Sequence, residues 1–309
     1  MNMGRKKLIW KKIKFLLASF ATSLAAIPFI AAKCGITDDS KKPTETPAEN
    51  PALAKVKEAW NNNIKDKISS AKNYTMILTM LKDSITDASL KESISLFNVD
   101  EARKRPVKEQ KGQTIMFKVG SDQLDLELGK VVAGMQKTIY VDKEGKNQET
   151  DAQDLSTVDG ANEATKIVQI GYYDDGKTIR VAQMPKTVTE VPTELPKEIT
   201  NLHKMFLESK EFDQDISSWD LSGVYNTSFM FHKAEKFNQD ITKWNTENVT
   251  NMRSMFYGTK AFDKDLSKLN VSSVKDAVEF AKNAKTDWKT EKQPKFNEGT
   301  LLERKNEQK

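Results

Sequence analysis

The sequence is poor in the residues that most often carry out reactions. Its 309 residues include one cysteine, Cys34, and two histidines, His203 and His232. A single cysteine cannot form an internal disulfide. The chain also has no glycine-rich phosphate-binding loop and no serine or threonine in a recognisable histidine-centred catalytic motif. We therefore expect a protein that is not an enzyme and that has no catalytic residues, no cofactor and no bound metal.

Positive charge is also scarce once the segment 1–33 is set aside. The formal net charge of the chain is +5, but residues 1–33 contain seven basic and no acidic residues. The remainder has 42 basic and 44 acidic residues, a formal charge of −2. Proteins that bind nucleic acids carry a basic surface on the folded domain. The charge distribution therefore predicts no nucleic-acid partner.

The segment 1–33 has the pattern of a secretion signal. Met1–Lys14 is basic, and Phe15–Ala32 is an uncharged apolar run that ends in small residues. Cys34 follows directly, and Ile30-Ala31-Ala32-Lys33-Cys34 resembles a bacterial lipobox, although Lys33 replaces the usual small residue. We expect a lipid anchor at Cys34 that holds the protein on the extracellular face of the cell membrane. The alternative is an uncleaved membrane anchor, because 18 apolar residues reach the lower limit for a membrane span.

The segment after Cys34 changes in composition twice. Residues 34–51 contain mostly polar residues and proline, which predicts a disordered tether. Residues 52–165 are expected to form a helical and then mixed α/β domain. Apolar residues from Leu53 to Ala71 recur at helical spacing, predicting one helix of about 20 residues, and two or three antiparallel helices are expected before Phe97. Strands are expected at Thr114–Val119, 124–128 and Lys137–Val141, and a loop at 144–163.

A hairpin is predicted between residues 166 and 184. Apolar residues alternate in Lys166–Tyr173 and in Lys177–Met184, and Asp174-Asp175-Gly176 lies between them. Asp-Gly between apolar runs is a strong hairpin signal. Three prolines then follow up to Pro196, which disfavour a helix. We expect residues 166–198 to form the amino-terminal cap of the next segment.

A 25-residue pattern recurs four times in residues 199–288. Its copies open at Ile199, Val224, Val249 and Val274. Such a unit cannot bury its own apolar face, so successive units are expected to stack into a solenoid. Met255, Thr259 and Phe262 are spaced i, i+4 and i+7, which predicts a helix of about two turns in each copy. The predicted repeat core comprises Met205, Phe206, Phe212, Ile216, Trp219, Met230, Phe231, Phe237, Ile241, Trp244, Met252, Met255, Phe256, Phe262 and Leu266.

The complete expectation is an α+β chain. A helical and mixed amino-terminal region precedes a short right-handed α/β solenoid of 25-residue repeats, capped by the hairpin and the proline-rich segment. The aromatic residues at equivalent positions, such as Phe212, Phe237 and Phe262, should form one continuous column. Residues 289–309 are highly charged and are expected to be a disordered tail.

The repeats closely resemble the BspA-like, leucine-rich-repeat-type surface proteins, especially the version found in mollicute (mycoplasma) lipoproteins. The resemblance rests on the Val-x-Asn-Met-x-x-Met-Phe, Phe-Asn-Gln-Asp-Ile and Trp-Asn/Asp elements of residues 199–288. It extends more weakly to Met184–Leu195. The family implies display at the cell surface, with adhesion or antigenicity as the role. It implies no reaction and names no ligand.

Acidic residues also recur with the repeat. Asp213 and Asp215 align with Asn238 and Asp240, and with Asp263 and Asp265. A column of oxygen ligands could bind Ca²⁺, but such side chains more often bond to the backbone of their own turn. We favour the second interpretation.

Two classes of function remain. The first is a surface protein that binds a protein or glycan on host or neighbouring cells, with variable repeat positions such as Lys233/Tyr257, Lys236/Lys260 and Thr246/Val271 making contact. The second is an extracytoplasmic solute-binding or enzymatic lipoprotein with its activity in residues 52–165. An antigenic decoy would have the same sequence features as an adhesin.

Overall fold

Two hydrophobic clusters organise the part of the chain that the structure describes. The computed structural model describes residues 50–297; the signal segment, Cys34, nearly all of the expected tether and residues 298–309 lie outside them. One cluster runs from Val56 to Val131, and the other from Tyr140 to Trp288. The segment expected to be one domain, 52–165, therefore contributes to both clusters. Within residues 50–297 no helix has the length and apolarity that a membrane span requires.

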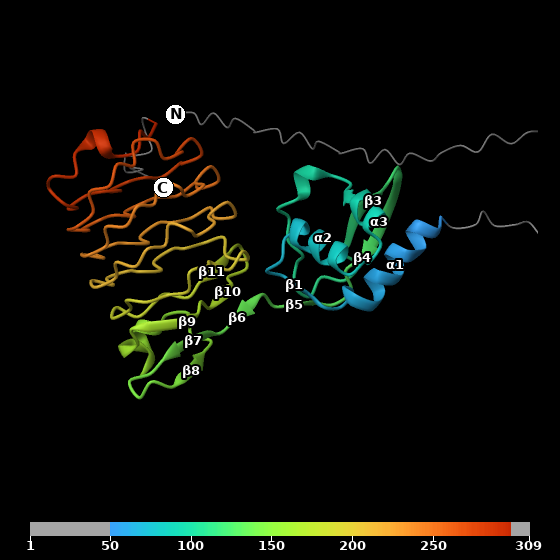
Figure 1. Cartoon of the computed structure of the whole chain (residues 1–309), viewed down its shortest axis with the longest axis horizontal. Coiled ribbons are helices and arrows are strands. Elements are labelled where there is room, and N and C mark those ends of the chain that lie inside the picture. Colours follow the sequence, from blue (N-terminus) through green and yellow to red (C-terminus); the bar gives the residue numbers. More distant parts are fainter. Residues whose placement is uncertain (1–49, 298–309) are drawn as a thin grey trace, which may run out of the picture. The chain divides into compact units, whose positions relative to one another are not determined.

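The first cluster is built from three helices and two small sheets (Figure 1). Strands β2, β3 and β4 form an antiparallel sheet, and β1 pairs with β5 in parallel. Strands β3 and β4 confirm the two strands expected there. The elements are α1 (Pro51–Asn63), β1 (Ile68–Ser69), α2 (Tyr74–Asp83), α3 (Ala88–Ser93), β2 (Ile94–Leu96), η1 (Val99–Glu101), β3 (Thr114–Val119), β4 (Asp122–Glu127) and β5 (Val131–Val132).

The expected long first helix is wrong, because α1 ends at Asn63. Asp66 adopts a left-handed backbone conformation (φ 65°), which a continuing helix does not permit. Ile68 is nevertheless buried, because it lies in β1. Trp60 belongs to the core as predicted: its ring meets Phe117 edge-on at 5.7 Å, and its indole N–H donates to the Glu127 carbonyl at 2.8 Å.

The second cluster begins with two further three-stranded sheets. Strand β7 pairs with β8 and β9, and β10 pairs with β6 and β11. The predicted hairpin is therefore correct only in its second half. Asp174-Asp175-Gly176 does connect paired strands, but these are β10 and β11, while β9 leaves to join β7. The elements are β6 (Met135–Gln136), β7 (Thr138–Val141), β8 (Asn147–Thr150), η2 (Leu155–Thr157), η3 (Ala161–Glu163), β9 (Lys166–Gln169), β10 (Tyr172–Asp174) and β11 (Ile179–Val181).

The four repeat copies lie side by side in register (Figure 1, yellow to red). Parallel bridges join Asn201 to Asn226, Asn226 to Asn251, and Asn251 to Asp276. A further parallel bridge joins Arg180 of β11 to Asn201, so β11 lies against the first copy. We call residues 199–288 the repeat array. With its few helices and several small antiparallel sheets, the chain is a mixed α+β protein.

The predicted two-turn helix in each copy is wrong. The array consists of successive turns and single bridges, with no α-helix between 199 and 288. Two residues per copy adopt the left-handed conformation (φ 49–71°), which interrupts any helix. They recur with the period of the repeat, so the backbone itself is periodic. The first set is Lys204, Phe229, Ser254 and Glu279, and the second is Glu208, Lys233, Gly258 and Asn283.

The expected aromatic column is confirmed. Phe212 and Phe237 stack with centroids 6.0 Å apart, and Phe237 and Phe262 at 5.9 Å. A second column of Phe206, Phe231 and Phe256 has spacings of 5.7 and 5.5 Å. Large aromatic rings bury much apolar area per residue, so these columns supply the array with its core.

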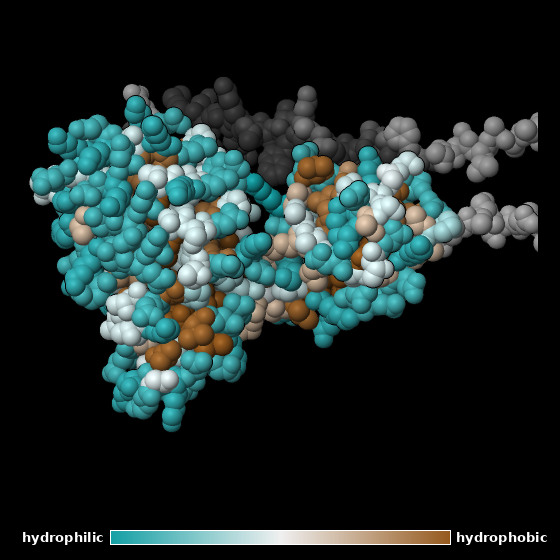
Figure 2. All heavy atoms as spheres, in the orientation of Figure 1, coloured by the Kyte–Doolittle hydropathy of each residue, from teal (hydrophilic) through white to brown (hydrophobic). Residues whose placement is uncertain are grey.

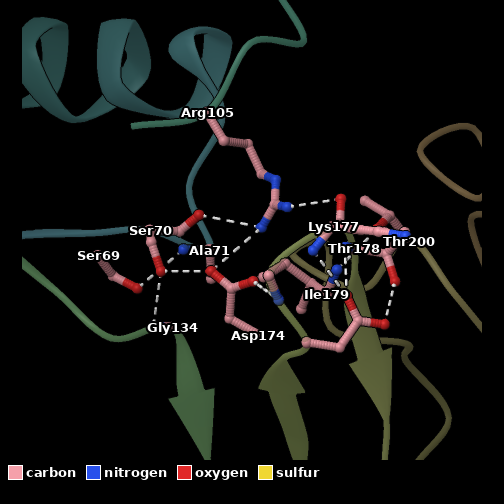
Figure 3. A network of polar contacts seen from close by, with 12 residues as sticks. Ser69, Ser70, Ala71, Arg105, Gly134, Asp174, Lys177, Thr178, Ile179 and Thr200 are labelled. Atoms are coloured by element: carbon pink, nitrogen blue, oxygen red, sulfur yellow. Dashed lines mark hydrogen bonds and ion pairs between the residues drawn. The ribbon is translucent and has the colours of Figure 1, made fainter. Parts of the chain in front are cut away.

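A polar network connects the first cluster to β10 (Figure 3). The Arg105 guanidinium lies 3.6 Å from the Asp174 carboxylate, and both side chains are 19% exposed. The Ser70 hydroxyl donates to Asp174 at 2.7 Å and accepts the N–H of Gly134 at 2.9 Å. Residue 134 must be glycine, because a Cβ there would lie 2.5 Å from the Ala71 nitrogen.

Residues 289–297 are ordered, although they were expected to begin a disordered tail. They include η4 (Thr290–Lys292) and place the ring of Phe296 5.0 Å from that of Phe280. This short segment therefore covers one side of the fourth copy.

Candidate binding surface

All fifteen residues named for the repeat core are buried. They maintain the array and are not accessible to a ligand. A binding surface must therefore consist of the side chains between them, which project from the turns of successive copies. On the face shown in Figure 2, hydrophilic side chains predominate over the array, and hydrophobic atoms show in patches between them.

Four of the six repeat positions expected to vary on the surface are accessible. Lys233, Lys236 and Lys260 are exposed, and Tyr257 is half-buried. The remaining pair, Thr246 and Val271, was expected on the surface but is buried. Thr246 and Val271 are 2% and 8% exposed: the threonine hydroxyl donates to the Asn270 carbonyl, and Val271 belongs to the hydrophobic cluster of the array. Periodicity alone could not distinguish these inward positions from the outward ones.

A row of four half-buried rings crosses three copies of the array, and we call it the aromatic row. His203 meets Phe229 edge-on at 5.6 Å, Phe229 lies 5.4 Å from His232, and His232 stacks on Tyr257 at 4.5 Å. The two histidines are therefore linked through Phe229, which the sequence analysis did not foresee. Only His232 and Tyr257 share a repeat position, and His203 and Phe229 occupy two others, so the period of the repeat does not predict the row.

Phe229 is the unusual member of the aromatic row. Its backbone is left-handed (φ 58°), a conformation that is costly for a bulky residue. The equivalent residues in the other copies are Lys204, Ser254 and Glu279, so the fold does not require an aromatic side chain there. A strained residue that the fold does not require points to a role in recognition.

Both imidazoles in the row are shifted toward the neutral form. Burial lowers the pKa of His203 to about 4, and the nearby Arg180 and Lys204 cations act in the same direction. Burial also lowers the pKa of His232, with Lys233 contributing. Nδ1 of His203 lies 2.7 Å from the Ser228 hydroxyl. Near neutral pH, each ring therefore carries no charge, and one nitrogen is a donor while the other is an acceptor. Nδ1 of His203 is engaged by Ser228 and Nδ1 of His232 is buried, so Nε2 is the nitrogen that each ring keeps for a ligand.

Ion pairs border the aromatic row and join neighbouring copies. Glu208 lies 2.8 Å from Lys186 and 3.3 Å from Lys233, and these two cations lower the pKa of its carboxyl group. Lys210 pairs with Glu235 at 3.3 Å. Such exposed pairs add little stability each, but they set an alternating charge pattern beside the row.

The aligned residues accept backbone N–H groups, but only Asp215, Asp240 and Asp265 do so within their own turn, as the favoured interpretation holds; Asp213 and Asn238 bond to the next copy. Asp213 accepts the N–H of Asn238 at 2.8 Å, and Asn238 accepts that of Asp263 at 3.2 Å. Asp215, Asp240 and Asp265 each accept a backbone N–H two residues on, at 2.9 Å. Within residues 50–297 no group of three or more His, Cys, Asp or Glu is placed to hold a metal ion.

A cavity of about 620 Å³ lies between α2 and the edge of the array. Met76 and Met80 line it from α2, and Ile199 and Tyr225 from the array. Lys72 and Arg103 lie among the charged residues of its lining. Lys72 pairs with Glu198 at 2.8 Å, and Arg103 donates to the Asn248 side chain at 2.5 Å. The volume falls in the range of small-molecule sites.

Comparison with known proteins finds one family whose model matches the array. Residues 181–293 match the family described as "Mycoplasma protein of unknown function, DUF285". The match begins in β11 and ends just after η4, so it includes all four copies. It covers less than half of the chain. No curated protein and no solved structure shows a significant match.

Proposed function

We propose that this chain is a surface lipoprotein whose repeat array binds a protein or glycan outside the cell. In this proposal the array is a short solenoid of the BspA-like, leucine-rich-repeat type. The parallel bridges and the two ring columns support a stacked arrangement. The match of residues 181–293 to a mycoplasma family is consistent with the resemblance to mollicute surface proteins.

The aromatic row is the observation that carries the proposal. Aromatic residues are enriched at the centres of protein interfaces, where a few of them provide most of the binding energy. Here four rings lie together on the array, and one of them accepts an unfavourable backbone conformation. Each neutral imidazole of the row keeps one nitrogen, Nε2, for a ligand, and it donates or accepts a hydrogen bond according to the tautomer, which suits amides and hydroxyls.

Exchanging one ring tests this role. We expect Phe229→Ser to weaken binding to a panel of immobilised glycans and matrix proteins by about tenfold or more. Serine occupies the equivalent position in the third copy, so the variant should fold. Phe97→Ser is the matched control, because Phe97 is 42% exposed and lies outside the array. Equal binding by the Phe229 variant and the control would rule out the aromatic row as the recognition surface.

The proposed lipid anchor has a separate test. The signal segment and Cys34 lie outside the described residues, so this part rests on sequence. Mass measurement of the mature protein should find an amino-terminal Cys34 with attached acyl chains. Two chains suffice for stable anchoring. An unmodified Met1 or an unmodified Cys34 would contradict the lipoprotein assignment.

Solute binding is the second candidate function, and the cavity beside α2 favours it. The cavity has apolar thioether and aromatic groups together with charged residues, as many small-ligand sites do. Met80→Trp should fill it and abolish binding of a solute there while leaving the aromatic row unchanged. A small-molecule screen by thermal shift, run on both proteins, separates the two candidates.

A further inference from the structure

Each of the first three copies of the array donates four backbone N–H groups to carbonyls of the next copy. All twelve of these hydrogen bonds have N···O distances of 2.7–3.1 Å. The donors recur with the period of the repeat. The bonds run from Leu202, Lys204, Phe206 and Glu208 to Asn226, Ser228, Met230 and His232, from Thr227, Phe229, Phe231 and Lys233 to Asn251, Arg253, Met255 and Tyr257, and from Met252, Ser254, Phe256 and Gly258 to Asp276, Val278, Phe280 and Lys282.

These bonds link peptide groups into continuous columns. The carbonyl of Asn226 and the N–H of Thr227 belong to one peptide group, which accepts from the first copy and donates to the third. The same holds in all four columns. Peptide dipoles linked in this way point in one direction and reinforce each other, as they do along a helix. The positive end of each column, where the last N–H group lies, is therefore in the fourth copy.

The columns end at four N–H groups of the fourth copy, which we call the donor row. They belong to Ala277, Glu279, Ala281 and Asn283, the repeat equivalents of the donors in the third copy. None of the four has a hydrogen-bond acceptor within residues 50–297. Asn283 is exposed, Glu279 and Ala281 are half-buried, and Ala277 is buried, so the accessible part of the row consists of the last three residues. As far as residues 50–297 show, the array therefore ends in an unpaired edge.

The two ends of the array differ in how they are closed. At the first copy, the N–H groups of Val181 and Met184 donate to the carbonyls of Asn201 and Met205. At the other end, Phe296 covers the ring of Phe280 in the fourth copy, and the Lys292 carbonyl accepts from Leu266 of the third copy. These contacts close the aromatic end, but they leave the donor row unpaired.

We propose that the donor row is a docking edge for an extended, acidic segment of a partner protein. An edge that presents donors cannot pair with the same edge of a second copy, so its complement must present acceptors. An extended peptide does so through its carbonyls, by addition to the edge of the array. Carboxylates fit best, because aligned peptide dipoles and left-handed turns such as that at Glu279 attract negative charge. The exposed Lys275, two residues before the row, adds positive charge.

Proline at Ala281 tests the proposal by removing one donor. The full chain carrying Ala281→Pro is compared with Ala281→Ser, which keeps the N–H group. The probe is an acetylated and amidated hexaglutamate peptide, with hexalysine as the charge control. We expect hexaglutamate to slow amide hydrogen exchange in residues 275–285 of the unmodified chain and of Ala281→Ser. Its affinity for Ala281→Pro should fall about tenfold, the effect of one hydrogen bond to a charged group.

A second variant is needed because proline also restricts the backbone of Phe280, so Ala281→Pro could lose binding by misfolding. Lys275→Glu should weaken hexaglutamate binding, and the weakening should diminish at high salt. Lys143→Glu, in the exposed turn between β7 and β8, should not. The proposal is overturned if hexaglutamate leaves exchange in 275–285 unchanged, if hexalysine binds equally well, or if Lys275→Glu and Lys143→Glu behave alike. This test does not involve the aromatic row, so its outcome is independent of the proposed function.

Discussion

The rings of Phe212 and Phe237 lie almost parallel, 6.0 Å apart between centroids and 7° between planes. The two residues occupy the same position in successive copies, and Phe262 continues the stack with nearly the same geometry. Each ring thus belongs to the core of two neighbouring copies. Because no copy can bury its apolar face alone, a change in one copy should be felt by the copies on both sides.

Removing the central ring should therefore cost much of the stability of the array. We expect Phe237→Ala to lower the free energy of unfolding by about 3–5 kcal/mol, the usual range for deleting a buried aromatic side chain. Urea unfolding followed by tryptophan fluorescence measures it, since Trp219 and Trp244 lie in the same core. Lys236→Ala is the control, because that side chain is exposed. A loss below about 1 kcal/mol would show that the column contributes little.

Glycine at residue 254 should stabilise the array. Ser254 is left-handed (φ 49°), 1% exposed, and its buried hydroxyl has no hydrogen-bond partner within residues 50–297. Ser254→Gly removes both unfavourable features and should raise the free energy of unfolding by about 1 kcal/mol, after the entropy cost of glycine.

The matched change, Ser228→Gly, should have the opposite sign. The Ser228 hydroxyl is engaged with His203 at 2.7 Å, and its backbone is not left-handed. We expect a loss of about 1–2 kcal/mol. Thermal or urea unfolding of both variants provides the comparison. If Ser254→Gly destabilises as much as Ser228→Gly, left-handed strain is not significant at that position.

The network around Asp174 should contribute to stability as a unit. Asp174→Asn removes the charge opposite Arg105 and should lower the free energy of unfolding by about 1–3 kcal/mol, because Arg105 is then partly desolvated without a counter-charge. A double-mutant cycle with Arg105→Gln measures the coupling. Glu144→Gln, which breaks the exposed pair with Lys143, should be near neutral. Additive effects of the two changes would mean that Arg105 and Asp174 act separately.

The shifted pKa of His203 predicts a pH dependence. The folded-state pKa of about 4 lies below the usual 6.5, so the unfolded chain binds the proton more tightly between these values. His203 should therefore destabilise the fold progressively as the pH falls from 6.5 toward 4. His203→Asn should reduce the loss of stability between pH 7.5 and pH 5, measured as the shift in urea midpoint. An unchanged shift would show that other groups, such as His232, account for the pH dependence.

The sequence predicted some structural elements correctly and others wrongly, and each outcome has a physical reason. Alternating apolar and polar residues in 114–128 indicated β3 and β4 correctly, because successive side chains of a strand point to opposite faces and only one of these faces is buried. The longer apolar pattern through Ile68 failed to predict where α1 ends, because a residue is buried alike in a helix or a strand. The aromatic row was missed because only two of its members, His232 and Tyr257, share a repeat position. A possible signal was the aromatic Phe229 at a position that is polar in the other copies.

The sequence alone determined that four equivalent units must share one core, since the constant period and the in-register aromatic residues leave each unit unable to bury its apolar face. It also identified most core positions, because Met, Phe, Ile and Trp recur there in the first two copies, but not the buried position that Thr246 and Val271 share. Only the tertiary structure determined the backbone conformation of each unit. The left-handed residues include Lys204, Glu208 and Phe229, which have no preference for that conformation. They adopt it because it directs their N–H groups to the next copy, and that gain exists only when the copies are stacked.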